Sequence, residues 1–268
     1  MKSITSRQNS LVTRIRNARR ERRTTRKYLV LDGRKVIADA QQSGVTIDTV
    51  LVAAAAFKSD PTIKHLCAQF DSNTTTLATC SERIMAAVST LRSPSQVVAL
   101  GSHKPLACES LISSKRNNFI VMPLAVQDPG NLGAIIRSAV AAGSSGIIVD
   151  RSSADPYSWK ALRGSMGCTF RLPIANTDDT FETLRQARRH GWVIVATSPH
   201  TGTSIYDATL NGRVILLVGN EGSGLESKLR QEVDLTLSIP MSGKIESLNV
   251  AVATAIIAYE IKRQRNRK

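Results

Sequence analysis

Three loops of this sequence place polar side chains directly after apolar strands, and they are the stretches best suited to carry chemistry. They span residues 127–137, 217–225 and 239–258. Strands of continuous apolar character, such as residues 214–218, are typical of a parallel sheet that is covered on both faces. In such a sheet, the loops that follow the carboxyl ends of the strands bind ligands. We therefore expect the three loops to converge on one site.

The first loop is a turn that leads into a helix. Pro129 and Gly130 force the turn, and Asn131 is placed to cap the helix that follows. Arg137 lies about 600° of helical rotation further on, within a broad sector of Asn131 at the same end of the helix. A guanidinium in that place is suited to bind a phosphate or a carboxylate. An arginine on a helix rich in Ala and Ile more usually faces solvent, and the residues alone leave both interpretations open.

The second loop is rich in glycine. Gly219, Gly222 and Gly224 follow a buried strand and would let the backbone approach a ligand closely. The loop has neither the Gly-Lys-Ser/Thr of a phosphate-binding loop nor the glycine pattern of a dinucleotide fold. Glu221 would repel a phosphate and suits a cation. A plain turn between a strand and a helix is the alternative.

The third loop runs from the end of a strand into the last predicted helix. Pro240 and Gly243 interrupt any regular element. Glu246, Ser247 and Asn249 then stand where the helix would start, beside the backbone N–H groups that a helix leaves free. Taken alone, these residues are explained more simply by an ordinary loop with a capped helix.

The elements that must position these loops form two predicted α/β units, one in the first hundred residues and a larger one after residue 118. Residues 101–117 contain Gly, His, Pro, several Ser and a Lys-Arg pair, and we interpret them as the join between two domains. The predicted strands are residues 28–31, 45–53, 74–78, 96–100, 119–122, 146–149, 170–174, 192–196, 214–218 and 235–239. The predicted helices are residues 6–20, 33–42, 61–70, 81–88, 131–142, 156–162, 178–190, 225–232 and 248–264.

Charge is the strongest bulk feature, with a net +15 that is concentrated at the N-terminus. Residues 1–27 carry ten Lys or Arg against the single acid Glu21, which indicates a polyanionic partner. An apolar face on this segment favours RNA over an organelle transit peptide, and the lack of an aromatic or Leu stripe disfavours a membrane surface. A basic glycine-rich loop at residues 163–167 either contacts RNA or packs inside the protein. The expected RNA-binding residues are Arg7, Arg14, Arg19, Arg20, Arg22, Arg23 and Arg163.

Composition argues against several other classes of protein. Apolar residues make up 42% of the chain but aromatic residues only 4%, so the core must be built from Val, Ile, Leu and Ala. There is no run of about 20 apolar residues to span a membrane and no apolar region typical of a secretory signal. The four Cys and four His lack the spacing of a metal site or of a disulfide framework. We expect no metal and a reduced, cytoplasmic compartment.

Together, the three loops resemble the signature motifs of a known family. They are similar in order and spacing to those of the SpoU (TrmH-type) RNA 2′-O-ribose methyltransferases of the SPOUT superfamily, over residues 119–262. The motifs read Asp128-Pro129-Gly130-Asn131-Leu132-Gly133-Ala134-Ile135-Ile136-Arg137, Val218-Gly219-Asn220-Glu221-Gly222, and Ile239-Pro240-Met241 through Glu246-Ser247-Leu248-Asn249-Val250. Residues 1–100 resemble the ribosomal-protein-like substrate-binding domain of many members, through Ser6-Arg7-Gln8-Asn9 and Leu31-Asp32-Gly33.

The resemblance implies an α/β fold with two domains. It implies an N-terminal RNA-binding domain at residues 1–104, a linker at 105–117, and a parallel-sheet methyltransferase domain with a deep trefoil knot at 118–268. It also implies S-adenosylmethionine as methyl donor and an obligate homodimer, with neither metal nor membrane. The family commonly has an Asp-Gly pair where the first strand ends and this chain reads Pro123-Leu124, a departure that bears on the geometry of that loop. Asp32 stands where Glu is more usual.

The resemblance also assigns roles to individual residues. The matching cofactor-binding positions are Thr197, Gly219, Asn220, Gly222, Ile239, Met241 and Leu248. The matching catalytic positions are Asn131, Arg137, Glu221, Ser247 and Asn249. We expect Arg137 to orient the ribose and a neighbouring phosphate, because a guanidinium does not give up its proton in a protein. Glu221 and Ser247 are expected to hold Arg137, and the two Asn to bind the substrate or pin the loops.

The favoured reaction is methylation of a ribose 2′-hydroxyl in 23S ribosomal RNA, with transfer RNA as the alternative substrate. A base-methylating relative is a second alternative, and the first motif argues against it. A non-catalytic RNA-binding or ribosome-assembly protein on the same fold is a third, and the intact second and third motifs argue against it. Housekeeping and antibiotic-resistance methylation look alike at this level.

Overall fold

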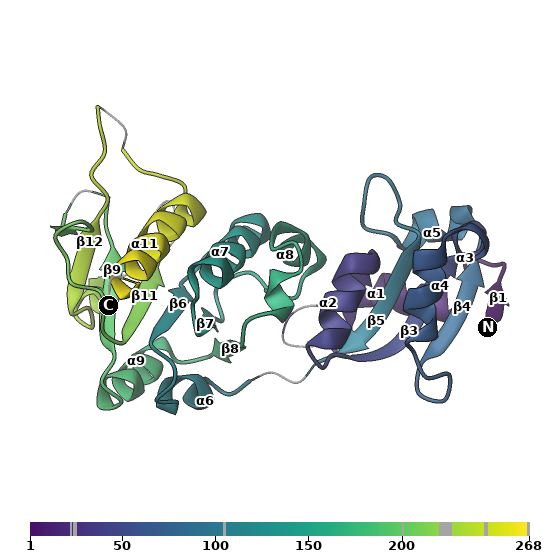
Figure 1. Ribbon diagram of the computed structural model, residues 1–268, viewed down its shortest axis with the longest axis horizontal. Helices are drawn as coiled ribbons and strands as arrows, with labels where there is room; N and C mark the ends of the chain where they lie inside the picture. Colours follow the sequence, from purple (N-terminus) through teal and green to yellow (C-terminus); the bar gives the residue numbers. More distant parts are fainter. Residues whose placement is uncertain are drawn as a thin grey trace. The chain divides into compact units, whose positions relative to one another are not determined.

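The chain folds into two compact units. The computed structural model describes residues 1–21, 23, 26–103, 106–199, 201–219, 227–243 and 246–266 (Figure 1). The first unit contains Met1–Lys104 with Tyr157–Leu162, and the second contains Pro105–Pro156 with Arg163–Lys268. Each unit is described by itself.

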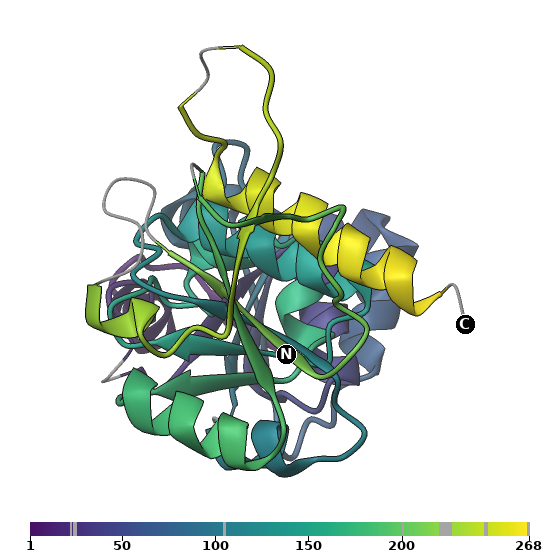
Figure 2. The same cartoon turned by 90° about the vertical axis from the view of Figure 1, so that its left-hand side faces the viewer.

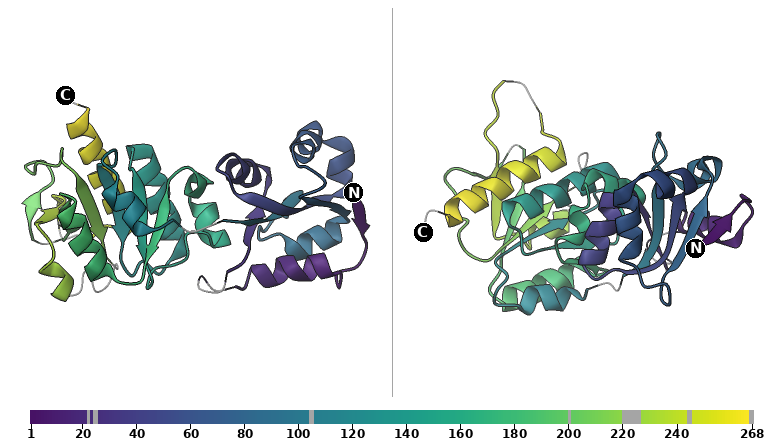
Figure 3. Two further views of the ribbon diagram at one scale, coloured as in Figure 1. Left: turned by 90° about the horizontal axis from the view of Figure 1, so that it is seen from below. Right: turned by 45° about the vertical axis from the view of Figure 1, so that its right-hand side comes forward.

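The first unit is a five-stranded mixed sheet with helices on both faces (Figure 3). The strand order is β1-β4-β3-β5-β2, in which β4 runs parallel to β1 and β3, and β5 runs antiparallel to β2 and β3. Helices α1 and α5 pack together, as do α2 and α4. The strands are β1 (Lys2–Ile4), β2 (Leu29–Asp32), β3 (Thr46–Ala53), β4 (Thr76–Cys80) and β5 (Val97–Ser102). The helices are α1 (Ser10–Ala18), α2 (Arg34–Gln42), α3 (Ala54–Ser59), α4 (Pro61–Ala68) and α5 (Glu82–Val88).

The basic N-terminal segment is part of this unit's core. Asn9 caps α1 by accepting a hydrogen bond from the Leu11 N–H, and three residues at helical spacing are buried beneath the helix: Val12, Ile15 and Ala18. The predicted helix over residues 6–20 is confirmed but begins later, because Asn9 caps it. Strand β1 precedes it and was not predicted.

The second unit is built on a seven-stranded parallel sheet. Its order is β10-β12-β9-β11-β6-β7-β8. The strands are β6 (Phe119–Pro123), β7 (Gly146–Asp150), β8 (Ile174–Thr177), β9 (Val193–Thr197), β10 (Thr203–Ser204), β11 (Val214–Val218) and β12 (Leu235–Ser238). Every residue of β6, β7 and β11 is buried, which confirms the parallel sheet covered on both faces that their continuous apolar character predicts.

Helices cover both faces of this sheet. Figure 2 shows α7 beside α11 on one face and α6 beside α9 on the other, and both pairs are in contact. The helices are α6 (Cys108–Ser113), α7 (Pro129–Ala142), α9 (Thr180–Arg189), α10 (Ser227–Arg230) and α11 (Val250–Arg265), with a short 3-10 helix η2 (Cys168–Phe170). Helix α8 (Trp159–Gly164) has its first four residues in the first unit and its last two in the second. Among the described helices, none is long and apolar enough to cross a membrane.

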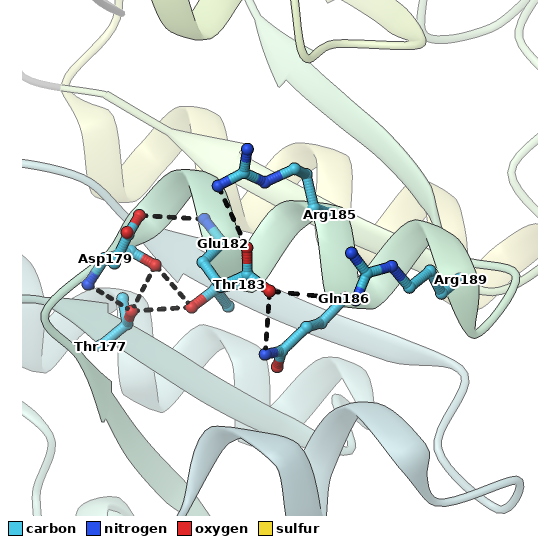
Figure 4. Close-up of polar contacts among 7 residues, drawn as sticks. All are labelled: Thr177, Asp179, Glu182, Thr183, Arg185, Gln186 and Arg189. Carbon is cyan, nitrogen blue, oxygen red and sulfur yellow. Dashed lines mark hydrogen bonds and ion pairs between the residues drawn. The ribbon is translucent and has the colours of Figure 1, made fainter.

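Local polar contacts fix the start of α9 (Figure 4). Asp179 caps the helix by accepting a hydrogen bond from the Glu182 N–H at 2.9 Å. The hydroxyls of Thr177 and Thr183 lie 2.7 Å apart, and Thr183 also donates to the Asp179 carbonyl. Arg185 pairs with Glu182 at 3.0 Å. These contacts explain why the helix predicted from residue 178 begins at Thr180.

The predicted linker belongs to the second unit. Residues 108–113 form α6, and Leu111 and Ile112 lie in the same buried cluster as Trp192. The Trp192 indole donates to the Ile112 carbonyl at 2.9 Å. We therefore assign residues 106–117 to the second unit, because two buried side chains and a buried hydrogen bond hold them there.

Several predicted boundaries were wrong. The strand predicted over residues 170–174 is the end of η2 followed by β8, which starts at Ile174. The helix predicted over residues 156–162 is α8, which starts at Trp159. The short elements α3 and β10 were not predicted. The trefoil knot concerns the path of the chain and stays a prediction.

Candidate active site

Four adjacent strands end at the same edge of the seven-stranded sheet. Thr197 at the end of β9 pairs with Leu237 of β12, and Val218 at the end of β11 pairs with Pro123 of β6. Ala196 of β9 pairs with Leu217 of β11. Because all these strands are parallel, the loops after them leave at one edge, here called the carboxyl edge. The three motif loops therefore converge, as the sequence predicts.

Several expected cofactor-binding residues line this edge. All of the following are partly exposed: Thr197, Gly219, Ile239, Met241 and Leu248. Among the described residues, no turn or loop hydrogen bond ends on a backbone group of Gly219, Ile239 or Leu248. These groups are therefore available to a ligand. The other two expected residues, Asn220 and Gly222, lie outside the described residues, as does Glu221.

A side-chain hydrogen bond joins the first and third motifs. The Asn249 amide Nδ2 donates to Oδ1 of Asn131 at 3.2 Å, across 118 positions of sequence. Asn249 also caps α11, where its Oδ1 accepts from the N–H groups of Ala251 at 2.9 Å and Val252 at 3.3 Å. One side chain thus starts the last helix and fixes it to α7.

The cap of α7 is a different residue from the one predicted. Oδ1 of Asp128 accepts from the Asn131 N–H at 2.7 Å, Pro129 occupies the first helical position, and Asn131 lies inside the first turn. The expectation that Asn131 caps the helix was therefore wrong. An Asp directly before a Pro is itself a signal for a helix start, and it identifies Asp128. Because Asn131 does not cap the helix, its side chain accepts the hydrogen bond from Asn249.

Arg137 lies further along α7 and is exposed. In the described part of the chain, its guanidinium takes part in no hydrogen bond or ion pair. Ser247 is also exposed, and no hydrogen bond joins it to Arg137 in that part of the chain. The structure therefore brings Asn131 and Asn249 together but does not join Arg137 to them. The expected support of Arg137 by Ser247 and Glu221 stays a prediction.

The loop that leads from β6 into the first motif is held by residues that the sequence did not single out. Buried Asp150, at the end of β7, accepts through Oδ1 from the N–H groups of Ala125 at 3.1 Å and Ser153 at 3.0 Å. The Ser153 hydroxyl accepts from the Val126 N–H at 3.0 Å. Ala125 has a φ of 54°, a left-handed conformation that favours Gly. An Asp at a strand end followed by Ser is the signal that would have identified this network.

A second loop packs on the same helix start. A Cβ added to Gly164 would lie 3.0 Å from the Gly130 carbonyl oxygen and 3.4 Å from the Gly133 Cα. The backbone at Gly164 therefore rests directly on the first turn of α7. Arg163 precedes it and is exposed, so this expected RNA-binding side chain lies close to the first motif.

Comparisons with known proteins identify the family. Residues 118–259 match the SpoU rRNA Methylase family, and residues 9–99 match the MRM3-like substrate binding domain. The 23S rRNA (guanosine(2553)-2'-O)-methyltransferase RlmP of Bacillus subtilis is 30% identical over 267 residues, which are 98% of this chain and 100% of that protein. The chain belongs to the SpoU rRNA methylase family.

Other similar proteins include members of this SpoU family with solved structures. The 23S rRNA (uridine(2479)-2'-O)-methyltransferase of Streptomyces viridochromogenes is 41% identical over 142 residues, 51% of this chain and 50% of that protein. An AdoMet-bound rRNA methyltransferase from Sinorhizobium meliloti superposes with a TM-score of 0.86 at 29% identity, over 98% of this chain and 97% of that one. AviRb from Streptomyces viridochromogenes, also with AdoMet, gives 0.85 at 29% identity, over 94% and 98%.

In this SpoU-family chain, several N-terminal arginines are already engaged by the fold. Arg7 donates to the Arg83 carbonyl at 3.1 Å, and Arg19 to the Ser89 carbonyl at 3.2 Å. Arg14 donates to the Thr49 hydroxyl at 2.7 Å and lies over the Tyr28 ring. Each of these arginines therefore helps to fix α1, whatever its contact with RNA.

The remaining expected arginines differ in their surroundings. Arg20 is exposed, Arg23 is partly buried, and Arg22 lies outside the described residues. Arg16 on α1 is also exposed and adds to the expected RNA-binding residues. In the described part of the chain, no three residues of the types His, Cys, Asp and Glu come together in a group suited to a metal ion.

Proposed function

We propose that the protein transfers a methyl group from S-adenosylmethionine to a ribose 2′-hydroxyl of 23S ribosomal RNA. One observation carries the proposal: the Asn249–Asn131 hydrogen bond fixes the third motif to the first, at the edge where the second motif begins. The family membership and the full-length similarity to RlmP support it. We also propose a cytoplasmic location, where a 23S ribosomal RNA substrate would be met.

The residues of the carboxyl edge fit the proposed cofactor. An adenosyl group needs apolar walls and backbone hydrogen-bonding groups, and the methionine part needs polar partners. Ile239, Met241 and Leu248 provide partly exposed apolar side chains, Thr197 a partly exposed hydroxyl, and Gly219 a backbone without a side chain. When bound, S-adenosylmethionine supplies an electrophilic methyl group on its sulfonium.

The protein's own residues position the acceptor. Arg137 has its guanidinium donors open to a phosphate beside the acceptor ribose, and a planar fork suits that contact. Asn131 and Asn249 offer amide groups at the rim, where they orient the ribose. The 2′-hydroxyl proton passes to a phosphate oxygen or to water, since a guanidinium does not accept it. Positioning therefore carries most of the rate enhancement.

Replacement of Arg137 tests the proposal. We expect Arg137→Ala to lower methyl transfer by about 10²–10³-fold, the scale of losing a positioning and charge-stabilising group. Binding of S-adenosylmethionine, measured by calorimetry, should stay within about twofold of wild type, because Arg137 is assigned to the RNA. Lys115→Ala, also exposed, is the matched control. Mapping of ribose methylation across total RNA from cells with and without the protein identifies the substrate, and an unchanged map would contradict the proposal.

The RNA-binding role of the N-terminal unit is tested by point substitution. Deletion of residues 1–27 would remove buried Val12 and Ile15 along with the charge. Arg16→Ala and Arg20→Ala change exposed side chains only. Each should weaken RNA binding and reduce the slope of log K against log salt by about one. An unchanged slope in the double variant would argue against α1 as an RNA surface.

We also propose that the protein is a homodimer that pairs through α11. Val252 and Tyr259 are 49% and 51% exposed, although both are large and apolar. They lie seven positions apart, so they share one face of the helix. Val252→Glu with Tyr259→Glu should convert a dimer to a monomer in sedimentation velocity. A wild-type chain that sediments as a monomer at micromolar concentration would contradict the proposal.

A further inference from the structure

Two strained residues flank the first turn of α7. In the described part of the chain, Ala125 and Met166 are the non-glycine residues with positive φ, at 54° and 52°. Ala125 lies three positions before the Asp128 cap, and Met166 lies two positions after Gly164, which rests on Gly130. Strained backbone of this kind gathers at functional sites. The Ala125 strain is explained by the Asp150 network, whereas Met166 needs its own explanation.

The backbone beneath Met166 is firmly held. The Ser165 side chain is fully buried, and its hydroxyl lies 2.8 Å from that of Thr169. The Met166 N–H donates to the Arg163 carbonyl at 3.1 Å, and the Cys168 N–H to the Ser165 carbonyl at 3.0 Å. Together with the tight contact of Gly164 on α7, these bonds make residues 163–167 a rigid corner.

The Met166 side chain at this corner adds little to the stability of the fold. Met166 is 50% exposed, so it contributes little to the core. A Gly would adopt the same conformation without strain, as Gly167 does at a φ of 83°. The chain therefore holds a long apolar side chain half-exposed on a rigid corner, beside the first motif and next to exposed Arg163.

We propose that Met166 packs against the base of the nucleotide at or next to the acceptor ribose, with Arg163 on a neighbouring phosphate. The inference rests on the proposed function and adds a positioning residue to it. Bases splayed out of structured RNA stack on protein side chains, and Met is among the apolar side chains that wedge between bases in DNA complexes. Its unbranched thioether adapts to either purine or pyrimidine faces. A rigid corner holds such a wedge at little entropic cost.

The test separates backbone strain from RNA contact. Methyl transfer is measured with the full chain, tritiated S-adenosylmethionine and 23S rRNA isolated from cells lacking the protein. Met166→Gly should raise Tm, because the left-handed strain is relieved, and yet lower kcat/KM for RNA by about tenfold, mainly through KM. Met166→Ala should show the same loss of activity, and Met166→Leu should restore kcat/KM to within about threefold of wild type. The KM for S-adenosylmethionine should not change in any of them.

The control is Val193→Ala, which truncates another exposed apolar residue, 41% exposed, at the start of β9. It should leave the KM for RNA unchanged. A Met166→Gly variant with raised Tm and full activity would overturn the inference while leaving the proposed function intact. A change of sedimentation coefficient in Met166→Ala would instead assign the side chain to a protein interface and overturn it as well. A wild-type chain that methylates no ribose would overturn the proposed function itself.

Discussion

The two edges of the seven-stranded sheet are built in opposite ways. At the amino edge, where the strands begin, Arg213 uses its guanidinium to hold separate segments together. It donates to the carbonyls of Asn117 at 3.1 Å, Ile112 at 3.0 Å and Ser114 at 3.0 Å, and also to that of His190. It lies 4.3 Å from the Trp192 ring centroid. Its N–H donors therefore bond to backbone carbonyls of the protein itself.

Other residues at the amino edge are engaged in the same way. Arg265, in the last turn of α11, donates to the Asn118 and Gly212 carbonyls at 2.7 Å each, and burial lowers its pKa. Asp234 accepts from the Ile194 N–H at 2.8 Å and from Arg188 at 2.9 Å. Charged side chains here donate to or accept from backbone groups and opposite charges, although the buried Nε of Arg265 has no hydrogen-bond partner among the described residues.

The carboxyl edge keeps its polar groups available. Arg137, on the helix α7 that starts at this edge, is exposed and, among the described residues, has no ion pair. The loop backbone at Gly219 and Ile239 is similarly unused there. The two edges of the sheet therefore have different roles. Side chains at the amino edge stabilise the fold, and those at the carboxyl edge are accessible to ligands. Substitutions at four positions test or sharpen this contrast.

Loss of Arg213 should have the largest effect on stability. Arg213→Ala leaves several carbonyls without a donor, and hydrogen bonds to a charged group contribute about 1.5–3 kcal/mol each. We expect the free energy of unfolding in urea to fall by about 3–4 kcal/mol. Arg116→Ala, exposed in the neighbouring segment, should change it by less than about 0.5 kcal/mol. A small effect at Arg213 would show that the amino edge does not depend on it.

Asp150 should matter for both stability and activity. Asp150→Ala removes the carboxylate that accepts from the Ala125 and Ser153 N–H groups, and we expect a loss of about 2 kcal/mol in the free energy of unfolding. The loop that carries the first motif should loosen, and methyl transfer should fall by about tenfold. Asp178→Ala, exposed at the start of α9, is the matched control. Full activity in Asp150→Ala would mean that the loop is held by other contacts.

Asn249 has two separable roles. Asn249→Asp keeps the oxygen that caps α11 but removes the Nδ2 donor to Asn131, whereas Asn249→Ala removes both. The free energy of unfolding should fall by about 1 kcal/mol in Asn249→Ala and should hardly change in Asn249→Asp. Both variants should lose activity if the link between the motifs is required. Normal methyl transfer by Asn249→Asp would show that capping alone is needed.

Relief of strain at Ala125 should have the smallest effect, and it should be stabilising. Ala125→Gly removes a left-handed conformation that costs an L-residue about 1–2 kcal/mol, partly offset by the greater freedom of Gly in the unfolded chain. We expect a net gain of about 0.5–1 kcal/mol. Ala86→Gly, at an exposed position inside α5, should instead cost about 1 kcal/mol. A lower free energy of unfolding in Ala125→Gly would contradict the strained geometry.

The sequence predicts which residues form the strands of the sheet better than it predicts the contacts between distant segments. Continuous apolar residues identify β6 and β11, and glycine at position 143 ends α7 where the sequence predicts. The motif residues are drawn to one edge because parallel strands end together. These features depend on local patterns of burial and turn chemistry, which a sequence displays directly.

Contacts between distant segments were not predictable in the same way. The Asn249–Asn131 bond joins residues 118 positions apart, and Arg213 gathers carbonyls from residues 112–117 and 190. No local pattern encodes such pairs. Residues 106–117 were misjudged for the same reason, since their polar composition suggests a linker while their two apolar side chains are buried by α9 and β8.

Hydrogen–deuterium exchange with and without S-adenosylmethionine tests the division between the two edges most directly. Peptides that cover residues 197–199, 215–219, 239–243 and 246–249 should become protected when the cofactor is added, because these residues line the carboxyl edge. Peptides that cover residues 112–118, 190–193 and 210–214 should exchange slowly in both states. Protection at the amino edge, or none at the carboxyl edge under saturating cofactor, would contradict the division of tasks between the two edges.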